Sequence, residues 1–295
     1  MARKKTSNTP DLSSLLLPPT PIMVAVEHAI LRRHEWSSAS APVAEQIAVR
    51  LAGVITLDLI HAGQRLLETE IGEVLRVSRA PVREALRILE RERLVEFRPR
   101  RGVLVTEPGA KDIADIYVVR IALFKILLRQ LMERRPADLE AVFDRHMPAL
   151  AKASEQGSVD DYALESFLLN MDMLKLSEGG LIADMLASIS LRILRYVRLA
   201  HAADPSRMAT TMKSWRALHR AVARRDVEEV LATATRRIEV SRDSAVQAVV
   251  EGQAPAPLSG TAASTRARSQ PSAPSRKSSA PTASRRRRAT AEPAS

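Results

Sequence analysis

The sequence predicts a mostly α-helical protein, with an N-terminal winged helix-turn-helix followed by an all-α antiparallel helical bundle. Of the 295 residues, 45% are hydrophobic but only 3% are aromatic, a balance typical of aliphatic helix packing. Two short helical patterns and two β-type segments follow one another between residues 68 and 105. Apolar residues at helical spacing then continue to about residue 250, interrupted only by helix breakers.

Changes in composition divide the chain into four predicted regions: an N-terminal extension (1–42), the winged helix-turn-helix (43–107), the bundle (110–251) and a disordered basic tail (252–295). Within the extension, residues 1–20 mix basic residues with Ser, Thr and Pro and are predicted to be disordered. A short helix is predicted from Pro21 to Trp36, because apolar residues recur near one face.

The winged helix-turn-helix is predicted from three helical patterns and a hairpin. The first helix covers residues 43–59, and a second begins near Glu68 after a break at His61-Ala62-Gly63. A third helix opens with Ser78 as its cap and has one apolar side, formed by Val82, Ala85, Leu86 and Leu89. Two short β-type runs follow, and they predict a two-stranded wing formed by Leu94–Phe97 and Val103–Val105.

Basic residues gather on the third helix and at the tip of the wing. Arg79, Arg83 and Arg87 step by four along a side of the helix away from its apolar residues. A solvated helix face, with Glu84 and Glu90 as ordinary ion-pair partners, is the alternative. The basic hairpin beside the helix favours DNA, because arginine forks match phosphate oxygens and the edge of guanine. The predicted DNA-binding residues are Ser78, Arg79, Arg83, Arg87, Arg100, Arg101 and Gly102.

Six helices are predicted in the bundle, separated by Pro136, Gly157, Gly179-Gly180, the step before Pro205, and Asp226. Helices of this length form an antiparallel bundle. Their predicted ranges are 111–134, 136–155, 158–177, 179–202, 205–224 and 226–250.

Several classes of function are excluded or disfavoured. The absence of cysteine excludes disulfides, thiolate zinc sites and cysteine nucleophiles. The sequence contains no GxxxxGK[ST], HExxH or GxSxG motif and no GxGxxG after a strand, so we expect no enzyme and no cofactor. Asp160, Asp161 and Glu165 could act as an acid/base set, but charges at a helix start are usually caps. No apolar run approaches the roughly 18 residues of a membrane helix, so we expect a cytoplasmic, nucleoid-associated protein with no membrane partner.

The net charge of +11 lies mostly in the tail. Residues 252–295 contain eight Lys or Arg residues against the single Glu292. The high isoelectric point is therefore weaker support for DNA recognition than the arginines of the third helix and the wing. The run Arg285 to Arg288 could bind DNA without sequence preference or could simply keep the chain soluble.

The run VSRAPVREALRILERERLVEFRPRRGVLV resembles the most specific signature of the GntR family of bacterial transcription regulators. DIADIYVVRIALFKILLRQL and WRALHRAVARRDVEEVLATATRRIEV resemble the FCD-type effector domain of one GntR subfamily, so the resemblance covers residues 43 to about 250. It implies DNA contacts from Ser78, Arg79, Arg83, Arg101 and Gly102. Two positions depart from the family pattern, because Thr69 replaces a frequent arginine and Ala62-Gly63 replaces the usual proline-glycine.

The resemblance also implies a cavity among the bundle helices, where many members hold a divalent metal with one Asp and three His. Aligned on the turn at Ser177 and on Asp226, these positions fall on Ser166, Asn170, Trp215 and Arg237, so no metal is expected. His201, expected away from the cavity, and His219, expected to be a partly buried helix histidine, do not restore the site. Amide and guanidinium donors suit an anion instead, which makes Arg120, Asn170, Trp215 and Arg237 the predicted ligand-binding residues. A purely structural interior is the alternative.

Taken together, these patterns predict a sequence-specific regulator, most simply a repressor, that binds a palindromic double-stranded operator as a homodimer. A small organic acid with a carboxylate would control it from the bundle. One alternative is an architectural protein that binds DNA without sequence preference through its wings and tail. Another is a helical-bundle enzyme with an accessory DNA-binding domain, which rests only on scattered carboxylates.

Overall fold

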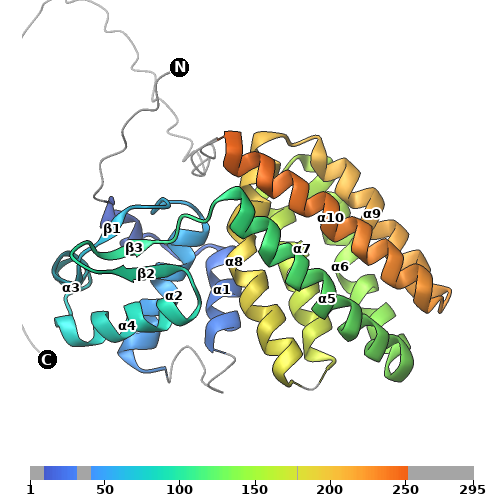
Figure 1. Ribbon diagram of the computed structural model, residues 1–295, viewed down its shortest axis with the longest axis horizontal. Helices are drawn as coiled ribbons and strands as arrows, with labels where there is room; N and C mark the ends of the chain where they lie inside the picture. The colour runs from blue at the N-terminus through green and yellow to red at the C-terminus, as the bar shows by residue number, and fades with distance from the viewer. Residues whose placement is uncertain (1–9, 32–40, 178, 252–295) are drawn as a thin grey trace, which may run out of the picture. The chain divides into compact units, whose positions relative to one another are not determined.

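The computed structural model describes residues 10–31, 41–177 and 179–251 and confirms the predicted fold class (Figure 1). We call residues 10–107 the head and residues 110–251 the bundle. The head contains a short 3-10 helix, four α-helices and a small sheet: η1 (Leu12–Leu16), α1 (Pro21–Leu31), α2 (Val43–Thr56), α3 (Glu68–Leu75), α4 (Arg79–Arg91), β1 (Arg65–Leu66), β2 (Val95–Arg98) and β3 (Gly102–Val105). The bundle contains α5 (Ala110–Arg134), α6 (Pro136–Gln156), α7 (Val159–Lys175), α8 (Leu181–Ala203), α9 (Arg207–Ala223) and α10 (Val227–Glu251).

The turn between α3 and α4 depends on two special backbone positions. Arg76 ends α3 in the left-handed region, with φ of 55°. A Cβ atom on Gly72 would lie 2.9 Å from the Val77 carbonyl oxygen, so only glycine lets the chain fold back this closely over α3. The four apolar residues predicted for the inner side of α4 are all buried, and α4 packs on α2.

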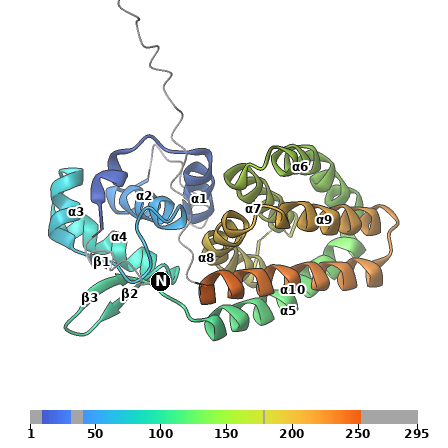
Figure 2. The same cartoon turned by 90° about the horizontal axis from the view of Figure 1, so that it is seen from above.

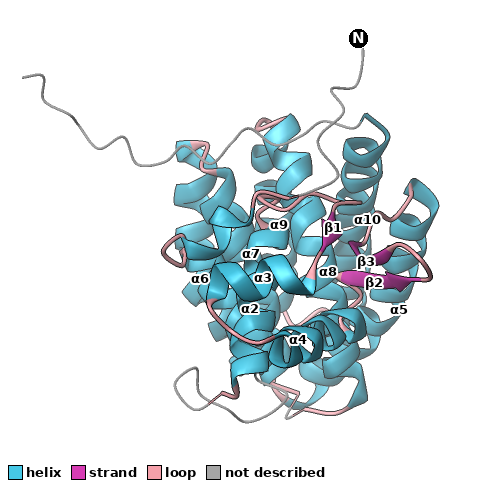
Figure 3. Cartoon of the chain, turned by 90° about the vertical axis from the view of Figure 1, so that its left-hand side faces the viewer, coloured by secondary structure: helices cyan, strands magenta, loops and turns pink. Residues whose placement is uncertain are grey.

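The sheet of the head has three strands rather than the predicted two. β3 lies in the middle and pairs antiparallel with both neighbours, in the order β1-β3-β2 (Figure 3). In the hairpin, Arg98 lies opposite Gly102, and Arg65 of β1 lies opposite Leu104. The prediction of a two-stranded wing was incomplete because β1 has only two residues, too few for an alternating pattern.

The N-terminal extension is part of the head. The prediction that residues 1–20 are disordered is wrong for residues 10–20, because η1 buries Leu12 and Leu15. Arg50 of α2 donates a hydrogen bond from Nε to the Leu15 carbonyl oxygen at 2.7 Å. The predicted helix is observed from Pro21 to Leu31, and it packs closely on α2, since a Cβ atom on Gly53 would lie 2.9 Å from Met23 Cγ. Residues 32–40, which include the end of the predicted helix, lie outside the described residues.

The six helices of the bundle begin and end within two residues of the predicted positions. Two observed ends show why the pattern was informative: Pro136 occupies the first turn of α6, and Gly157 ends that helix with φ of 67°. α10 runs beside α5, as Figures 1 and 2 both show, and the aliphatic interior fills with residues from all six helices. None of the helices described here is both long and apolar enough to cross a membrane.

We predict that η1 contributes measurably to the stability of the head. Leu15→Ala should lower the free energy of unfolding by about 2–5 kcal/mol, because this side chain is 2% exposed. Leu16→Ala is the matched control, since Leu16 is 66% exposed and its loss should change the free energy by less than about 0.5 kcal/mol. Urea unfolding followed by circular dichroism measures both, and equal effects would contradict a docked η1.

Candidate functional site

Two sites stand out, an arginine-rich face of the head and a cavity in the bundle. On α4, the arginines at positions 79, 83 and 87 are all exposed, as predicted. Arg83 donates from Nε and Nη2 to the two carboxylate oxygens of Glu68 on α3, at 2.9 and 2.8 Å. These hydrogen bonds lower the pKa of Glu68. Arg87 forms an ion pair with Glu90 at 2.9 Å and lies over the Phe97 ring at 3.9 Å.

The carboxylate partners of Arg83 and Arg87 compete with any external anion. The side chains of both arginines are more than half exposed, at 63% and 51%. Exposed ion pairs contribute only about 0–1 kcal/mol, so a phosphate group can replace them at low cost. At the start of α4, Ser78 occupies the capping position, but its side chain makes no capping hydrogen bond.

The tip of the wing is strongly basic. Arg100 and Gly102 both have positive φ, at 62° and 77°, which turns the chain tightly between β2 and β3. Arg65 of β1 lies close to this turn, because a Cβ atom on Gly102 would be 3.3 Å from Arg65 Nε. Sequence reasoning missed Arg65, since its strand was not recognised. A polar hollow on the wing is lined by four arginines, Arg65, Arg98, Arg100 and Arg101, together with Glu96 and Glu107.

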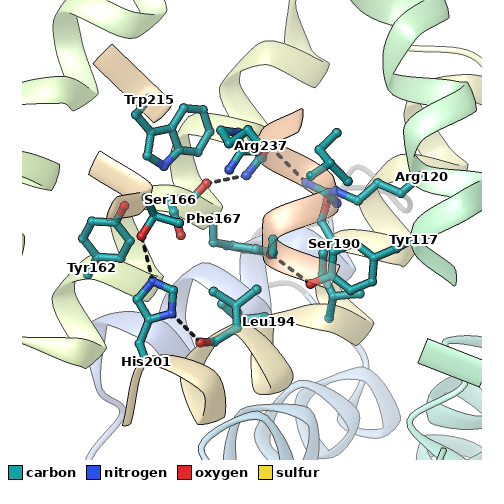
Figure 4. A pocket seen from close by; sticks show the side chains of 16 residues that line it. Tyr117, Arg120, Tyr162, Ser166, Phe167, Ser190, Leu194, His201, Trp215 and Arg237 are labelled. Atoms are coloured by element: carbon teal, nitrogen blue, oxygen red, sulfur yellow. Dashed lines mark hydrogen bonds between the residues drawn. The ribbon is translucent and has the colours of Figure 1, made fainter. Parts of the chain in front are cut away.

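A cavity opens among α5, α7, α8, α9 and α10 (Figure 4). The volume of the cavity is about 40 Å³, which is room for about three water molecules. Its polar wall is formed by Tyr117, Arg120, Tyr162, Ser166, Asn170, Ser190, His201, Thr211, Trp215, Arg237 and Ser241. The structure thus brings together the four residues for which the sequence predicted ligand binding.

Two buried guanidinium groups dominate the electrostatics of this cavity. Arg120 donates from Nη1 to Ser190 Oγ at 2.8 Å and from Nη2 to Asn170 Oδ1 at 3.2 Å. Arg237 stacks on the Trp215 ring at 3.6 Å, and its Nε atom has no hydrogen-bond partner. Figure 4 shows Arg237 between Trp215 and Arg120.

Burial opposes the charge on both groups. It lowers the pKa of Arg120 to about 10, and burial together with the nearby charge of Arg120 lowers the pKa of Arg237 to about 9. Among the described residues, no Asp or Glu lines the cavity. The site therefore holds two positive charges without an internal counterion, an arrangement that attracts an anion.

His201 corrects one expectation from the sequence. It lines the cavity rather than lying away from it, because α8 continues to Ala203 and keeps residue 201 on the same face as Leu194 and Val197. Its Nδ1 atom donates to the Val197 carbonyl oxygen at 2.9 Å. Burial lowers the pKa of His201 to about 4, so the ring is neutral at pH 7. His219 is not part of the cavity wall, and its Nε2 atom lies 3.0 Å from Asp144 Oδ1.

The cavity wall does not fit a divalent metal. Ser166, Asn170, Trp215 and Arg237 offer a hydroxyl, an amide, an indole and a cation, none of which is a strong metal ligand. Within residues 10–31, 41–177 and 179–251, no three His, Asp or Glu side chains gather as a metal site would require.

Helix α8 touches both the cavity and the head. Ser190, Leu194 and His201 face the cavity. From the same helix, Arg195 forms a buried ion pair with Asp58 of the head, and Arg198 donates to the Leu57 carbonyl oxygen at 3.0 Å. Ser188 also donates to Glu92 Oε2 at 3.0 Å. A shift of α8 at the cavity would therefore change the contacts that this helix makes at the end of α2 and at the end of α4.

Comparison with known proteins identifies both parts of the chain. Residues 43–105 match the family described as "Bacterial regulatory proteins, gntR family", and residues 115–240 match the FCD domain. An uncharacterized HTH-type transcriptional regulator of Bacillus subtilis, YdhC, is 31% identical over 33% of this chain and 44% of its own length. The gluconate operon transcriptional repressor of the same organism is 28% identical over 48% of this chain and 57% of its own length. The chain thus spans about half the length of these curated relatives.

Two solved structures have a similar fold. E. coli McbR/YncC superposes with a TM-score of 0.61 over 70% of this chain and 98% of that protein, at 19% identity. A putative transcriptional regulator GntR from Rhodococcus sp. RHA1 gives a TM-score of 0.59 over 69% and 97%, at 21% identity. At these identities the comparison supports the fold alone.

We predict that Arg237 destabilises the folded chain when no anion is bound. Arg237→Met should raise the free energy of unfolding by at least about 1 kcal/mol, because it removes one of two buried like charges and keeps an apolar group against Trp215. Trp215→Ala should instead lower it by about 3–5 kcal/mol, since this side chain is 1% exposed. Thermal and urea unfolding in a buffer without carboxylates measure both, and a loss of stability in Arg237→Met would contradict the assignment of an uncompensated charge.

Proposed function

The chain belongs to the gntR family of bacterial regulatory proteins and carries an FCD domain, and from this premise we propose that it is a repressor released from its operator by a small organic acid. As a family member it is a transcription regulator and not an enzyme. Our proposal goes beyond the family in three properties: repression, control by an organic acid, and association as a homodimer. We propose that the protein acts in the cytoplasm, on the bacterial chromosome.

For the DNA side, we assign operator recognition to α4 and the wing. Arg79, Arg83 and Arg87 lie exposed along one helix whose opposite side is buried, a shape that suits the major groove. Arg100 and Arg101 at the wing tip would contact flanking phosphates. One head reads only a few base pairs, so two copies on a palindromic site supply the specificity that a regulator needs.

For the ligand side, one observation carries the proposal. Two buried guanidinium groups face one cavity whose described wall has no carboxylate, and a carboxylate ligand would supply the missing negative charge. The small open volume of about 40 Å³ favours a compact acid with few heavy atoms. The hydroxyl groups of Ser190 and Ser241 would accept or donate hydrogen bonds to its polar substituents.

For regulation, we assign the coupling to α8. An acid that competes with Ser190 for Arg120 would change the contacts of α8 at the cavity, and the same helix is paired with Asp58 through Arg195. Operator affinity would then change by the difference in acid affinity between the two arrangements. Repression is the mode printed in the name of one relative, the gluconate operon transcriptional repressor. Release of the operator by the acid is our own addition to it.

The alternative is a protein that coats DNA without a preferred site, using the wing and the basic tail. The tail, residues 252–295, lies outside the described residues. A regulator keeps its operator when random DNA is added in excess, whereas a coating protein exchanges onto the random DNA. Sequencing DNA bound by the protein in cells identifies the operator needed for this competition.

We predict that α4 reads bases. Arg79→Ala and Arg83→Ala should each weaken operator binding by about 1–3 kcal/mol and should weaken binding to random DNA much less. Arg216→Ala on α9, an exposed arginine of the bundle, is the control and should change neither. Gel-shift titrations at one fixed salt concentration compare the three variants. An equal loss on operator and random DNA would rule out base reading.

We also predict that compact carboxylates bind the bundle. Acetate, lactate and malonate should raise the melting temperature, with a stabilisation of about 2.7 kcal/mol at a concentration of 100 times Kd. Gluconate, which is larger, should raise it less, and sodium chloride at equal ionic strength controls for screening. The rise should vanish in Arg237→Met, because one of the two guanidinium groups is gone. An equal rise in wild type and variant would place the acids elsewhere.

A further inference from the structure

The outward face of α5 is apolar at its centre. Val118, Val119 and Ile126 are 58%, 44% and 44% exposed, and the small Ala122 between them is exposed as well. On a helical wheel of about 100° per residue, these side chains lie within about 60° of the direction of Ala122. The exposed Lys125 lies at the opposite edge of the face, as far from Ala122 as Val119 is. The buried side of the same helix packs against α10 and α8. Aliphatic residues rarely gather in this way on a helix that has no partner.

Charged residues continue this face toward both ends of the helix. Lys111 and Asp115 lie on it near the N-terminus, and Arg129 and Glu133 lie on it near the C-terminus, all of them exposed. Their spacing is symmetric about Ala122, because Asp115 and Arg129 lie equally far from it along the chain, and so do Lys111 and Glu133. Reading outward from Ala122, each acidic residue on one side therefore has a basic residue at the same distance on the other.

This symmetry makes the face complementary to itself. When two copies of α5 pack antiparallel about a two-fold axis at Ala122, Val118 meets Ile126 of the other copy. In the same arrangement Asp115 meets Arg129 and Lys111 meets Glu133, and the axis repeats every pair. A small residue at the crossing lets the two helices approach closely. A partner of different sequence would not require the order of charges to reverse about the centre.

We propose that this face of α5, residues 111–133, is the surface through which two copies of the chain associate. The inference rests on the proposed function only in that a dimer suits a palindromic operator, and it names the interface that such a dimer uses. Competing contacts inside one chain are weak. The Lys111–Asp115 pair at 2.6 Å and the Arg129–Glu228 pair at 3.0 Å join exposed groups, so both can rearrange on association.

The test is a charge exchange measured on the full chain by sedimentation equilibrium. Asp115→Arg and Arg129→Asp, made singly, should each weaken dimerisation by at least about tenfold, because each places like charges opposite one another twice. The double variant Asp115→Arg/Arg129→Asp should restore the wild-type dimer, although it loses the same contacts within the chain. Ala122→Glu should give a monomer, and Leu181→Glu, at a position 75% exposed on α8, should leave the dimer unchanged. Circular dichroism confirms that every variant folds.

A wild-type monomer, an undisturbed dimer in the single variants, or a double variant that stays monomeric would each overturn the proposed interface. Operator binding is measured separately. If the wild-type dimer binds its operator and none of these substitutions changes its association, the proposed function stands and only the α5 interface is refuted. If dimerisation weakens in the single variants and recovers in the double variant, but the chain prefers no DNA sequence, the α5 interface stands and the proposed function is refuted.

Discussion

Two like charges are buried together in the bundle, and the rest of the cavity is organised around them. Taking a guanidinium ion out of water costs several kcal/mol unless it is paired. Arg120 recovers part of this through Ser190 and Asn170, and Arg237 recovers part through Trp215. Neither has a carboxylate partner within the described cavity wall. Buried charges that lower the stability of the fold are typical of a binding site, where a bound ligand supplies the opposite charge.

Helix α8 gives this cavity a route to the head. Its inner face contributes Ser190 and His201, while Arg195 reaches Asp58 in a pair that is buried on both sides. Breaking a buried ion pair on one side only is strongly unfavourable, so α8 and the end of α2 should move as a unit or not at all. In the proposed function, a discrete rearrangement of this kind would turn a small change at a ligand into a change in the spacing of two DNA-binding heads.

The sequence was sufficient for those features that depend on local patterns. Proline and glycine marked the ends of the bundle helices, and apolar spacing identified the inner side of α4. It was not sufficient where a segment is short or its partner distant. β1 has two residues, and η1 is stabilised by burial of Leu12 and Leu15 rather than by a pattern of its own.

The cavity shows the same division. The register of the resembling family brought Arg120, Asn170, Trp215 and Arg237 to one place, although no spacing in the sequence links residues so far apart. His201 was misplaced because its position near a helix end suggested a place away from the cavity, whereas the last turn of α8 stays packed and His201 lines the cavity wall. The pairing of Asp58 with Arg195 joins residues 137 positions apart, and it is the fold that reveals it.

In the proposed function, acid binding in the bundle and operator binding by the head are coupled, and linkage makes this coupling measurable in one experiment. The affinity for the acid that stabilises the chain most is determined by titration calorimetry, first with the free protein and then with the protein saturated by operator DNA. The affinity for the acid should be lower with operator bound, by the same factor by which the acid weakens operator binding, typically about 5–150-fold. Equal acid affinities in the two titrations would contradict the coupling and leave the cavity without a regulatory role.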